Sequence, residues 1–497
     1  MLVKSSRKKM SQSRIIDHVP NNIIALSKQA SDEDWLQSIH RHDLDVYEHF
    51  AESYVVDKRL TRQLVSFQAN KKRSCYRWYK YKEAFSADLV AYLLEKYAPP
   101  KGKILDPFSG AGTALFAASD LGFESEGIEL LPIGQEITAA NLSLRGQGQK
   151  EILKVINRWI QDKPWENAGD TITLNSLRIT DGAYPPKTEY SLCRYLHDIQ
   201  RESTAAQTIL RFALLCILES ISYTRKDGQY LRWDHRSGRR PGKSTFDKGK
   251  ILTFEEAIIL KLQQIKDDIS KDPEPTLFPE AMPTITGGSV KLMNGSCLDI
   301  LPRQKRRSYS AIITSPPYCN RYDYTRTYAL ELALLGIQEK ELVALRQAML
   351  SCTVENKKKS LLETQPAWKL PTDICDDFPL LQELLKYLEY KKELKELNNT
   401  GISRMVRGYF YETACVIFEC YRVLKKHGYM YMVNDNVRYA GASVSVDSIL
   451  SKIAEEIGFS VERILVLPQG KGNSSQQMGH HGREPLRKCV YVWKKVA

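Results

Sequence analysis

The sequence predicts an α/β fold built on a largely parallel, doubly wound sheet, and three observations support this prediction. An apolar run at residues 103–106 is followed by a glycine-containing turn, an apolar helix and a second apolar run at residues 123–130. That order of strand, turn, helix and strand opens many α/β sheets. The composition, with 42% hydrophobic and 26% charged residues, is that of a globular protein. Further apolar runs follow at residues 289–296, 310–318, 429–435, 459–467 and 488–495.

The elements before and after the first strand carry recognisable end signals. Residues 85–98 have the apolar spacing of a helix, with Ser86 as a plausible N-cap, and Pro99 to Gly102 end it. The helix after the glycine turn ends at Gly122. The strand that follows ends in an acid, Glu129.

Regular alternation stops after residue 140, where helices are predicted at residues 151–162, 189–222 and 254–270. A second polar, helical stretch, at residues 336–404, separates the apolar run at 310–318 from the run at 429–435. We therefore expect six segments: an N-terminal helical extension (1–74), a first core part (75–140), a helical insertion (141–287), a second core part (288–335), a second helical insertion (336–404) and a C-terminal core part (405–497).

The net charge of +13 is concentrated in three windows of the chain. Residues 1–14 carry five positive charges and no acid, and residues 71–82 carry six and no acid. Residues 221–250 carry nine basic and three acidic residues, and the rest of the chain is net negative. Clustered positive charge is typical of a nucleic-acid-binding surface, although a solvated basic loop explains any single window equally well.

The cysteine pattern and the hydropathy exclude several protein classes. The ten cysteines are scattered without a CxxC pair, which argues against a zinc module or a secreted disulfide framework. The basic N-terminus lacks the apolar run of a signal peptide. Residues 208–221 form the longest apolar stretch, but Arg211 and Glu219 interrupt it, so it predicts a buried helix and not a membrane span. We expect a cytoplasmic protein with reduced thiols, no metal site and no membrane partner.

The first motif that indicates chemistry is the turn DPFSGAGT at residues 106–113. Gly110 and Gly112 let the backbone pass close to a ligand and adopt conformations that other residues resist. The following helix directs its free amide groups at the same place. Glu129 ends the next strand, where a carboxylate can accept both hydroxyls of a ribose. The combination predicts a nucleoside cofactor, and the departure from GxGxxG argues against a dinucleotide.

The second motif is TSPPY at residues 314–318, at the carboxyl end of another predicted strand. Its two prolines remove two amide donors and leave carbonyl acceptors. Ser315 adds an acceptor, and Tyr318 offers a ring that can stack on a flat base. These acceptors suit the exocyclic amine of a nucleobase, whereas the motif taken alone also fits a proline turn that caps a strand.

Together, DPFSGAGT and TSPPY resemble the motif pair of the amino-methylating DNA methyltransferases, which use S-adenosylmethionine on cytosine N4 or adenine N6. The resemblance covers about residues 75–140, 288–335 and 405–497. It implies a Rossmann-like methyltransferase fold: a largely parallel seven-stranded sheet, with helices on both faces and, here, helical insertions. It also implies double-stranded DNA as the partner, with the target base flipped out of the duplex.

The resemblance further implies roles for individual residues. The family's cofactor-binding positions match Phe85, Ser86, Asp106, Phe108, Gly110, Gly112, Thr113 and Glu129. The segment NGSCLDIL, residues 294–301, would touch the adenine ring. Many relatives have an acid directly after its glycine, whereas here Ser296 stands there and Asp299 follows, so both are candidates. The catalytic motif would be Ser315, Pro316, Pro317 and Tyr318.

The implied reaction is a direct methyl transfer. The Ser315 side chain and the Pro316 carbonyl would accept hydrogen bonds from the exocyclic amine and aim its lone pair at the methyl group, while Tyr318 stacks on the base. No covalent enzyme intermediate is needed, so no cysteine has to be a nucleophile. Serine at the first position of SPPY favours N4 of cytosine. N6 of adenine stays open, because a hydroxyl and a carboxylate can both accept from an amine.

The insertion at residues 141–287 is the candidate target-recognition region. Within it, residues 223–243 form a basic stretch in which cationic side chains lie among aromatic ones. The residues expected to contact nucleic acid are Arg225, Lys226, Arg232, Arg236, Arg239 and Arg240. The second insertion and the glycine-containing loop at residues 470–484 are further candidates for contact with DNA or a partner. No nuclease constellation is evident, so a restriction endonuclease or another defence-system partner would be a separate chain.

Two other functions stay open from the sequence alone. A structured-RNA base methyltransferase also pairs a glycine turn with a PPY motif, but it usually has Asp or Asn before the prolines and an RNA-binding domain. A non-catalytic DNA-binding subunit would share the fold, but the intact glycines, Glu129 and SPPY argue against it.

Overall fold

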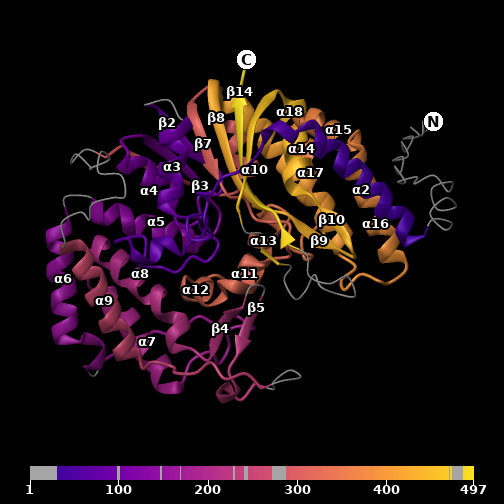
Figure 1. The fold of residues 1–497 in the computed structure, drawn as a ribbon. Helices are drawn as coiled ribbons and strands as arrows, with labels where there is room; N and C mark the ends of the chain where they lie inside the picture. Colours follow the sequence, from indigo (N-terminus) through magenta and orange to yellow (C-terminus); the bar gives the residue numbers. More distant parts are fainter. Residues whose placement is uncertain are drawn as a thin grey trace, which may run out of the picture.

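The computed structural model describes residues 31–97, 101–145, 148–167, 169–227, 230–239, 245–270, 287–468, 471–472 and 485–497. Its centre is an eight-stranded sheet covered by helices on both faces, and a helical lobe lies to one side of it (Figure 1). The basic window at residues 1–14 and most of the loop at residues 470–484 lie outside the described residues.

The sheet is built from strands that are far apart in the sequence. It contains β1 (Tyr54–Val56), β2 (Lys103–Asp106), β3 (Glu124–Glu129), β6 (Val290–Asn294), β7 (Tyr309–Thr314), β8 (Leu424–Asp435), β11 (Phe459–Val466) and β14 (Lys488–Lys495), in the spatial order β1-β11-β14-β8-β7-β2-β3-β6. Seven of these strands share one direction, and β14 runs against its neighbours β8 and β11. The predicted count of seven strands is one too few, because β1 from the N-terminal extension adds to the edge at β11.

Alternating side chains of the central strands pack against two helical layers. In β7, Ala311 and Ile313 pack with α3 (Ala87–Tyr97) and α4 (Thr113–Asp120). Ile312 between them packs with α17 (Ile402–Val423) and α18 (Val446–Ile457). Successive side chains of a strand point to opposite faces, so a strand covered on both faces needs apolar residues throughout. This explains the continuous apolar runs of the sequence.

The first insertion forms the helical lobe, with a hydrophobic core of its own. Its helices are α6 (Gln149–Asp162), α7 (Pro186–Ile199), α8 (Thr204–Ile221) and α9 (Phe254–Ser270), and α5 (Pro132–Arg145) joins them to the sheet (Figure 1). The stretch predicted as helical over residues 189–222 is thus two helices. Among the described residues, α8 alone is long and apolar enough to cross a membrane, but 56% of it is buried inside this lobe, as predicted for residues 208–221.

The lobe also contains a two-stranded hairpin, although the sequence predicts a helical insertion. Its strands are β4 (Thr224–Asp227) and β5 (Tyr230–Trp233), which pair antiparallel. The hairpin lies below α11 (Tyr324–Thr327) and α12 (Ala329–Leu334) in Figure 1. The basic stretch of the sequence therefore begins in an ordered β-ribbon.

The remaining helices and strands belong to the N-terminal extension, the second core part, the second insertion and the C-terminal part. They are α2 (Asp32–His49), α10 (Cys297–Ile300), α13 (Glu339–Ala348), α14 (Leu361–Thr364), α15 (Lys369–Asp376), α16 (Pro379–Glu393), and the short strand pairs β9 (Val437–Tyr439) with β10 (Ala442–Val444) and β12 (Lys471–Gly472) with β13 (Pro485–Leu486). The N-terminal helix α2 lies along α16 (Figure 1), and Lys391 pairs with Asp32 at 2.5 Å.

Candidate active site

A cavity of about 580 Å³ opens at the carboxyl ends of β2, β3, β7 and β8. Open α/β sheets bind their ligands at this edge. The cavity brings together most of the residues selected from the two motifs: Phe85, Asp106, Phe108, Gly110, Thr113, Glu129, Ser296, Ser315, Pro316, Pro317 and Tyr318. Residues more than 200 positions apart therefore face one space.

The glycine turn between β2 and α4 requires its glycines. Gly110 and Gly112 have φ values of 51° and 76°, in the region that side chains disfavour. A Cβ on Gly112 would lie 2.9 Å from the Phe116 ring. The turn thereby brings the N-terminus of α4, with its free amide groups, to the cavity.

Glu129 at the end of β3 is held by the backbone around it. Its two carboxylate oxygens accept hydrogen bonds from the Gly110 amide at 2.6 Å and the Leu131 amide at 2.7 Å. Burial raises the pKa of Glu129 to about 8, although these amide hydrogen bonds act against the shift. Each oxygen has a further lone pair, so the carboxylate can still accept from a ligand hydroxyl.

Thr314 connects the two motifs directly. Its hydroxyl donates to Asp106 at 2.7 Å, and the Phe108 amide donates to the same oxygen at 3.0 Å. The adjacency follows from the sheet, because β2 and β7 are parallel neighbours with Leu105 opposite Ile312. Burial raises the pKa of Asp106 to about 7, against these two hydrogen bonds.

The SPPY segment ends in a hydrogen-bonded group. Ser315 Oγ donates to Tyr318 Oη at 3.1 Å, and Lys488 Nζ lies 3.4 Å from the same Oη. Lys488 also pairs with Asp435 at 3.1 Å, since β14 and β8 place the two residues opposite each other. Burial lowers the pKa of Lys488, but the Asp435 carboxylate outweighs burial and keeps it above its usual value. The ammonium group next to Tyr318 is therefore charged.

Three of the selected residues do not line the cavity. Ser86 is buried, where its hydroxyl accepts from the Leu89 amide at 3.1 Å, as an N-cap does. Gly112 contributes the backbone conformation of the turn and does not itself face the cavity. Asp299 is exposed in α10, whereas Ser296 lines the cavity and donates to the Ala348 carbonyl at 2.9 Å. Of the two candidates for the adenine contact, Ser296 lines the cavity and Asp299 does not.

The cations of the basic stretch differ in what they contact. Arg225 is exposed on β4, and Arg232 on β5 lies over the Phe246 ring at 4.2 Å. Arg239 stacks on Trp233 at 3.8 Å and donates to two backbone carbonyls. Arg240 lies outside the described residues.

Lys226 corrects one expectation of a nucleic-acid contact. Its side chain is only 5% exposed, and its ammonium group lies 2.5 Å from the Glu331 carboxylate and 3.0 Å from the Tyr79 hydroxyl. A lysine enclosed in this way is not available to a phosphate. Lys226 alternates with Arg225 along β4, so it faces the opposite side of the ribbon.

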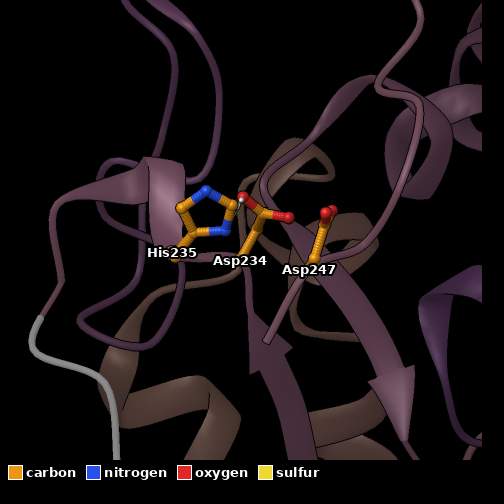
Figure 2. A group of neighbouring side chains, drawn as sticks. All are labelled: Asp234, His235 and Asp247. Carbon is orange, nitrogen blue, oxygen red and sulfur yellow. Dashed lines mark ion pairs between the residues drawn. The ribbon is translucent and has the colours of Figure 1, made fainter. Parts of the chain in front are cut away.

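Figure 2 shows Asp234, His235 and Asp247, three side chains close enough to share a cation. Both oxygens of the buried Asp234 are already engaged, because Arg236 donates to them at 2.7 and 2.9 Å. This arginine holds the pKa of Asp234 well below its usual value. The ion pair between Arg236 and Asp234 therefore explains why these side chains lie together, because it holds the loop after β5. The same ion pair engages Arg236 within the protein.

Several cavity residues were missed at the sequence level. Asp435 ends an apolar strand at the same sheet edge as Glu129, so the rule that selected Glu129 would have selected it too. Tyr81 lines the cavity and stacks on Tyr328 with ring centroids 5.1 Å apart. Lys488 comes from the antiparallel strand near the C-terminus, and no motif marks it.

Comparison with known proteins places the chain in a family, although no family model matches it. It is 56% identical over 468 residues to Type II methyltransferase M.AvaI of Nostoc sp. and of Anabaena variabilis, covering 94% of this chain and 96% of each relative. It is 42% identical over 465 residues to Type II methyltransferase M.BsoBI of Geobacillus stearothermophilus, covering 87% of this chain and 88% of the relative. Because the similarity extends across the insertions as well as the sheet, the chain belongs to the Type II methyltransferases.

Proposed function

We propose that this protein transfers a methyl group from S-adenosylmethionine to the exocyclic N4 of a cytosine flipped out of double-stranded DNA. Membership of the Type II methyltransferases supports site-specific DNA methylation and implies this cofactor. The choice of cytosine N4 rests on the resemblance, in which serine at the first position of SPPY favours cytosine; the acceptors themselves fit the amine of adenine as well. A restriction endonuclease on a separate chain is the partner that a Type II enzyme of this kind would have.

The observation that carries the proposal is the hydrogen bond from Ser315 to Tyr318. A serine hydroxyl has one hydrogen and two acceptor lone pairs. Here the hydrogen is used by Tyr318 Oη at 3.1 Å, so the lone pairs of Ser315 are left for a donor in the cavity. An exocyclic amine is such a donor, and the Pro316 carbonyl adds a second acceptor beside it.

The chain's residues fit the proposed cofactor. The turn at Gly110, the acids Asp106 and Glu129, and the rings of Phe85 and Phe108 together offer amide donors, carboxylate acceptors and apolar surface in one cavity. When bound, S-adenosylmethionine supplies an electrophilic methyl group. The residues that would hold it are Phe85, Asp106, Phe108, Gly110, Thr113, Glu129 and Ser296.

The same residues position the two reactants. The hydrogen bond between Thr314 and Asp106 fixes the end of β7 against the end of β2, and hence the amine acceptors against the cofactor turn. Tyr318 offers its ring to the flipped base, and Lys488 holds the hydroxyl of that ring. Positioning of this kind, together with the placement of the amine acceptors, supplies the rate in a direct transfer.

Nucleoside analysis tests the proposal. Unmethylated DNA is incubated with the protein and S-adenosylmethionine, digested and analysed by mass spectrometry for N4-methyldeoxycytidine. The appearance of N6-methyldeoxyadenosine alone, or methylation of tRNA but not of DNA, would overturn the assignment.

The S315A variant tests the role of the hydroxyl. It should lower the methylation rate roughly 100-fold or more, as the loss of one positioned hydrogen-bond partner does, and leave cofactor affinity largely unchanged. The control is S308A, which removes a hydroxyl that donates only to the local Lys305 carbonyl. Equal rates for S315A and the unmodified protein would refute the acceptor role.

A further inference from the structure

The β4–β5 hairpin of the helical lobe reaches the catalytic cavity. Among the described residues of the insertion at 141–287, Asp227 at the end of β4 is the one that lines this cavity, together with Ser315 and Tyr318. A carboxylate is unexpected there, because the hairpin belongs to the basic stretch and phosphates repel acids. Its position calls for a ligand that donates hydrogen bonds.

The hairpin is fastened to the catalytic core beside Asp227. The buried Lys226 side chain binds Glu331 of α12 at 2.5 Å and the Tyr79 hydroxyl at 3.0 Å. From the core side, Lys82 donates to the Lys226 carbonyl at 2.6 Å. Both the side chain and the backbone of residue 226 are thus anchored, which holds the neighbouring carboxylate at a fixed place relative to SPPY.

Asp227 forms an ion pair with a neighbouring cation. Arg232 on β5 lies 3.6 Å from the Asp227 carboxylate, and the two side chains are 41% and 49% exposed. Phe246 supports the guanidinium of Arg232 at 4.2 Å, and Arg225 lies opposite Arg232 in the strand register. The hairpin therefore presents an acceptor and a donor side by side, with a second cation next to them.

This arrangement matches one base pair better than the others. In the major groove, guanine shows two acceptors, which arginine binds, and cytosine shows an amine donor, which a carboxylate binds. A two-stranded ribbon fits that groove, and Arg225 is then placed for a phosphate. We propose that Asp227 and Arg232 read a C·G pair next to the flipped base, and so set the sequence specificity of the enzyme. This inference rests on the DNA methyltransferase function proposed above.

The test is a comparison of sequence profiles. The unmodified protein and the D227N variant each methylate a DNA library with randomised sequence, and the modified sites are mapped by sequencing. The unmodified protein should require a C·G pair at one position beside the target. D227N should relax that requirement roughly 10- to 100-fold, the range for one base contact, and leave other positions unchanged.

A matched control and a second variant make the outcome decisive. Asp247 is an exposed acid of the same lobe that lies 3.6 Å from Arg236 and does not line the cavity, so D247N should keep the full profile. R232Q should relax the same position as D227N. Unchanged profiles in D227N and R232Q, whether or not the overall rate falls, would overturn the inference while leaving the methyltransferase function intact. Failure of the unmodified protein to methylate any DNA would instead refute the proposed function.

Discussion

The ion pair between Lys226 and Glu331 offers a stability test whose size follows from its burial. The two side chains are 5% and 1% exposed, with 2.5 Å between Nζ and Oε1. The K226M variant keeps an unbranched side chain but removes the charge, which leaves the Glu331 carboxylate buried without a cation. Removing one partner of a buried pair costs roughly 3–5 kcal/mol of unfolding free energy.

Thermal unfolding followed by circular dichroism measures this loss. For a folding unit of 150–250 residues, that loss lowers the melting temperature by roughly 6–20 °C. The control is K154M, because Lys154 pairs with Glu151 at 2.8 Å but the two side chains are 73% and 74% exposed. An exposed pair contributes less than about 1 kcal/mol, so K154M should change little.

A double variant separates the lost pair from the orphaned charge. In K226M/E331L both charges are absent, and most of the lost stability should return, because apolar side chains can replace a buried ion pair. Equal melting temperatures for K226M and K154M would refute the reasoning. So would a double variant that is less stable than K226M.

Two further predictions concern the cavity. Cofactor affinity should rise with pH between about 6 and 8, because Glu129 and Asp106, with pKa values raised to about 8 and 7, accept hydrogen bonds from a ligand more strongly as carboxylates than as neutral acids; calorimetric affinities that do not change with pH would contradict this. K488M should lower the turnover number roughly 10-fold and leave cofactor affinity unchanged, because the charge that holds Tyr318 is lost. The control K494M, on the same strand but away from the cavity, should leave both quantities unchanged, and equal turnover for K488M and K494M would exclude a positioning role.

The part of the site that could be predicted from sequence is the part with local signals. The turn at Gly110 follows a strand directly, and its glycines are required by backbone conformations that the chain itself dictates. Glu129 lies one helix later, at a strand end. Such features involve short separations along the chain, so residue type and spacing are sufficient to find them.

The part that could not be predicted depends on partners far apart in the chain. The basic stretch predicts Lys226 as a nucleic-acid contact, because its partner Glu331 is more than 100 residues away and no pattern connects them. Lys488 reaches Tyr318 from the antiparallel strand. The strand β1 has three residues, too few for any periodicity, and exists only because β11 offers it an edge.

The contacts of the basic residues show that net charge alone does not measure how much of the surface can bind DNA. Of the six cations in residues 71–82, three are engaged inside the protein: Arg73 by Asp88, Arg77 by Asp268 and Lys82 by the Lys226 carbonyl. A cation paired with a carboxylate, as Arg73 and Arg77 are, adds little to the field that attracts DNA, so the sequence total overstates the DNA-binding surface. Exposed cations such as Arg225 can supply affinity for any phosphate backbone, but they cannot distinguish one sequence from another. Specificity requires a group that reads bases, and in the hairpin that group includes the carboxylate of Asp227, which a count of net charge would score against DNA binding.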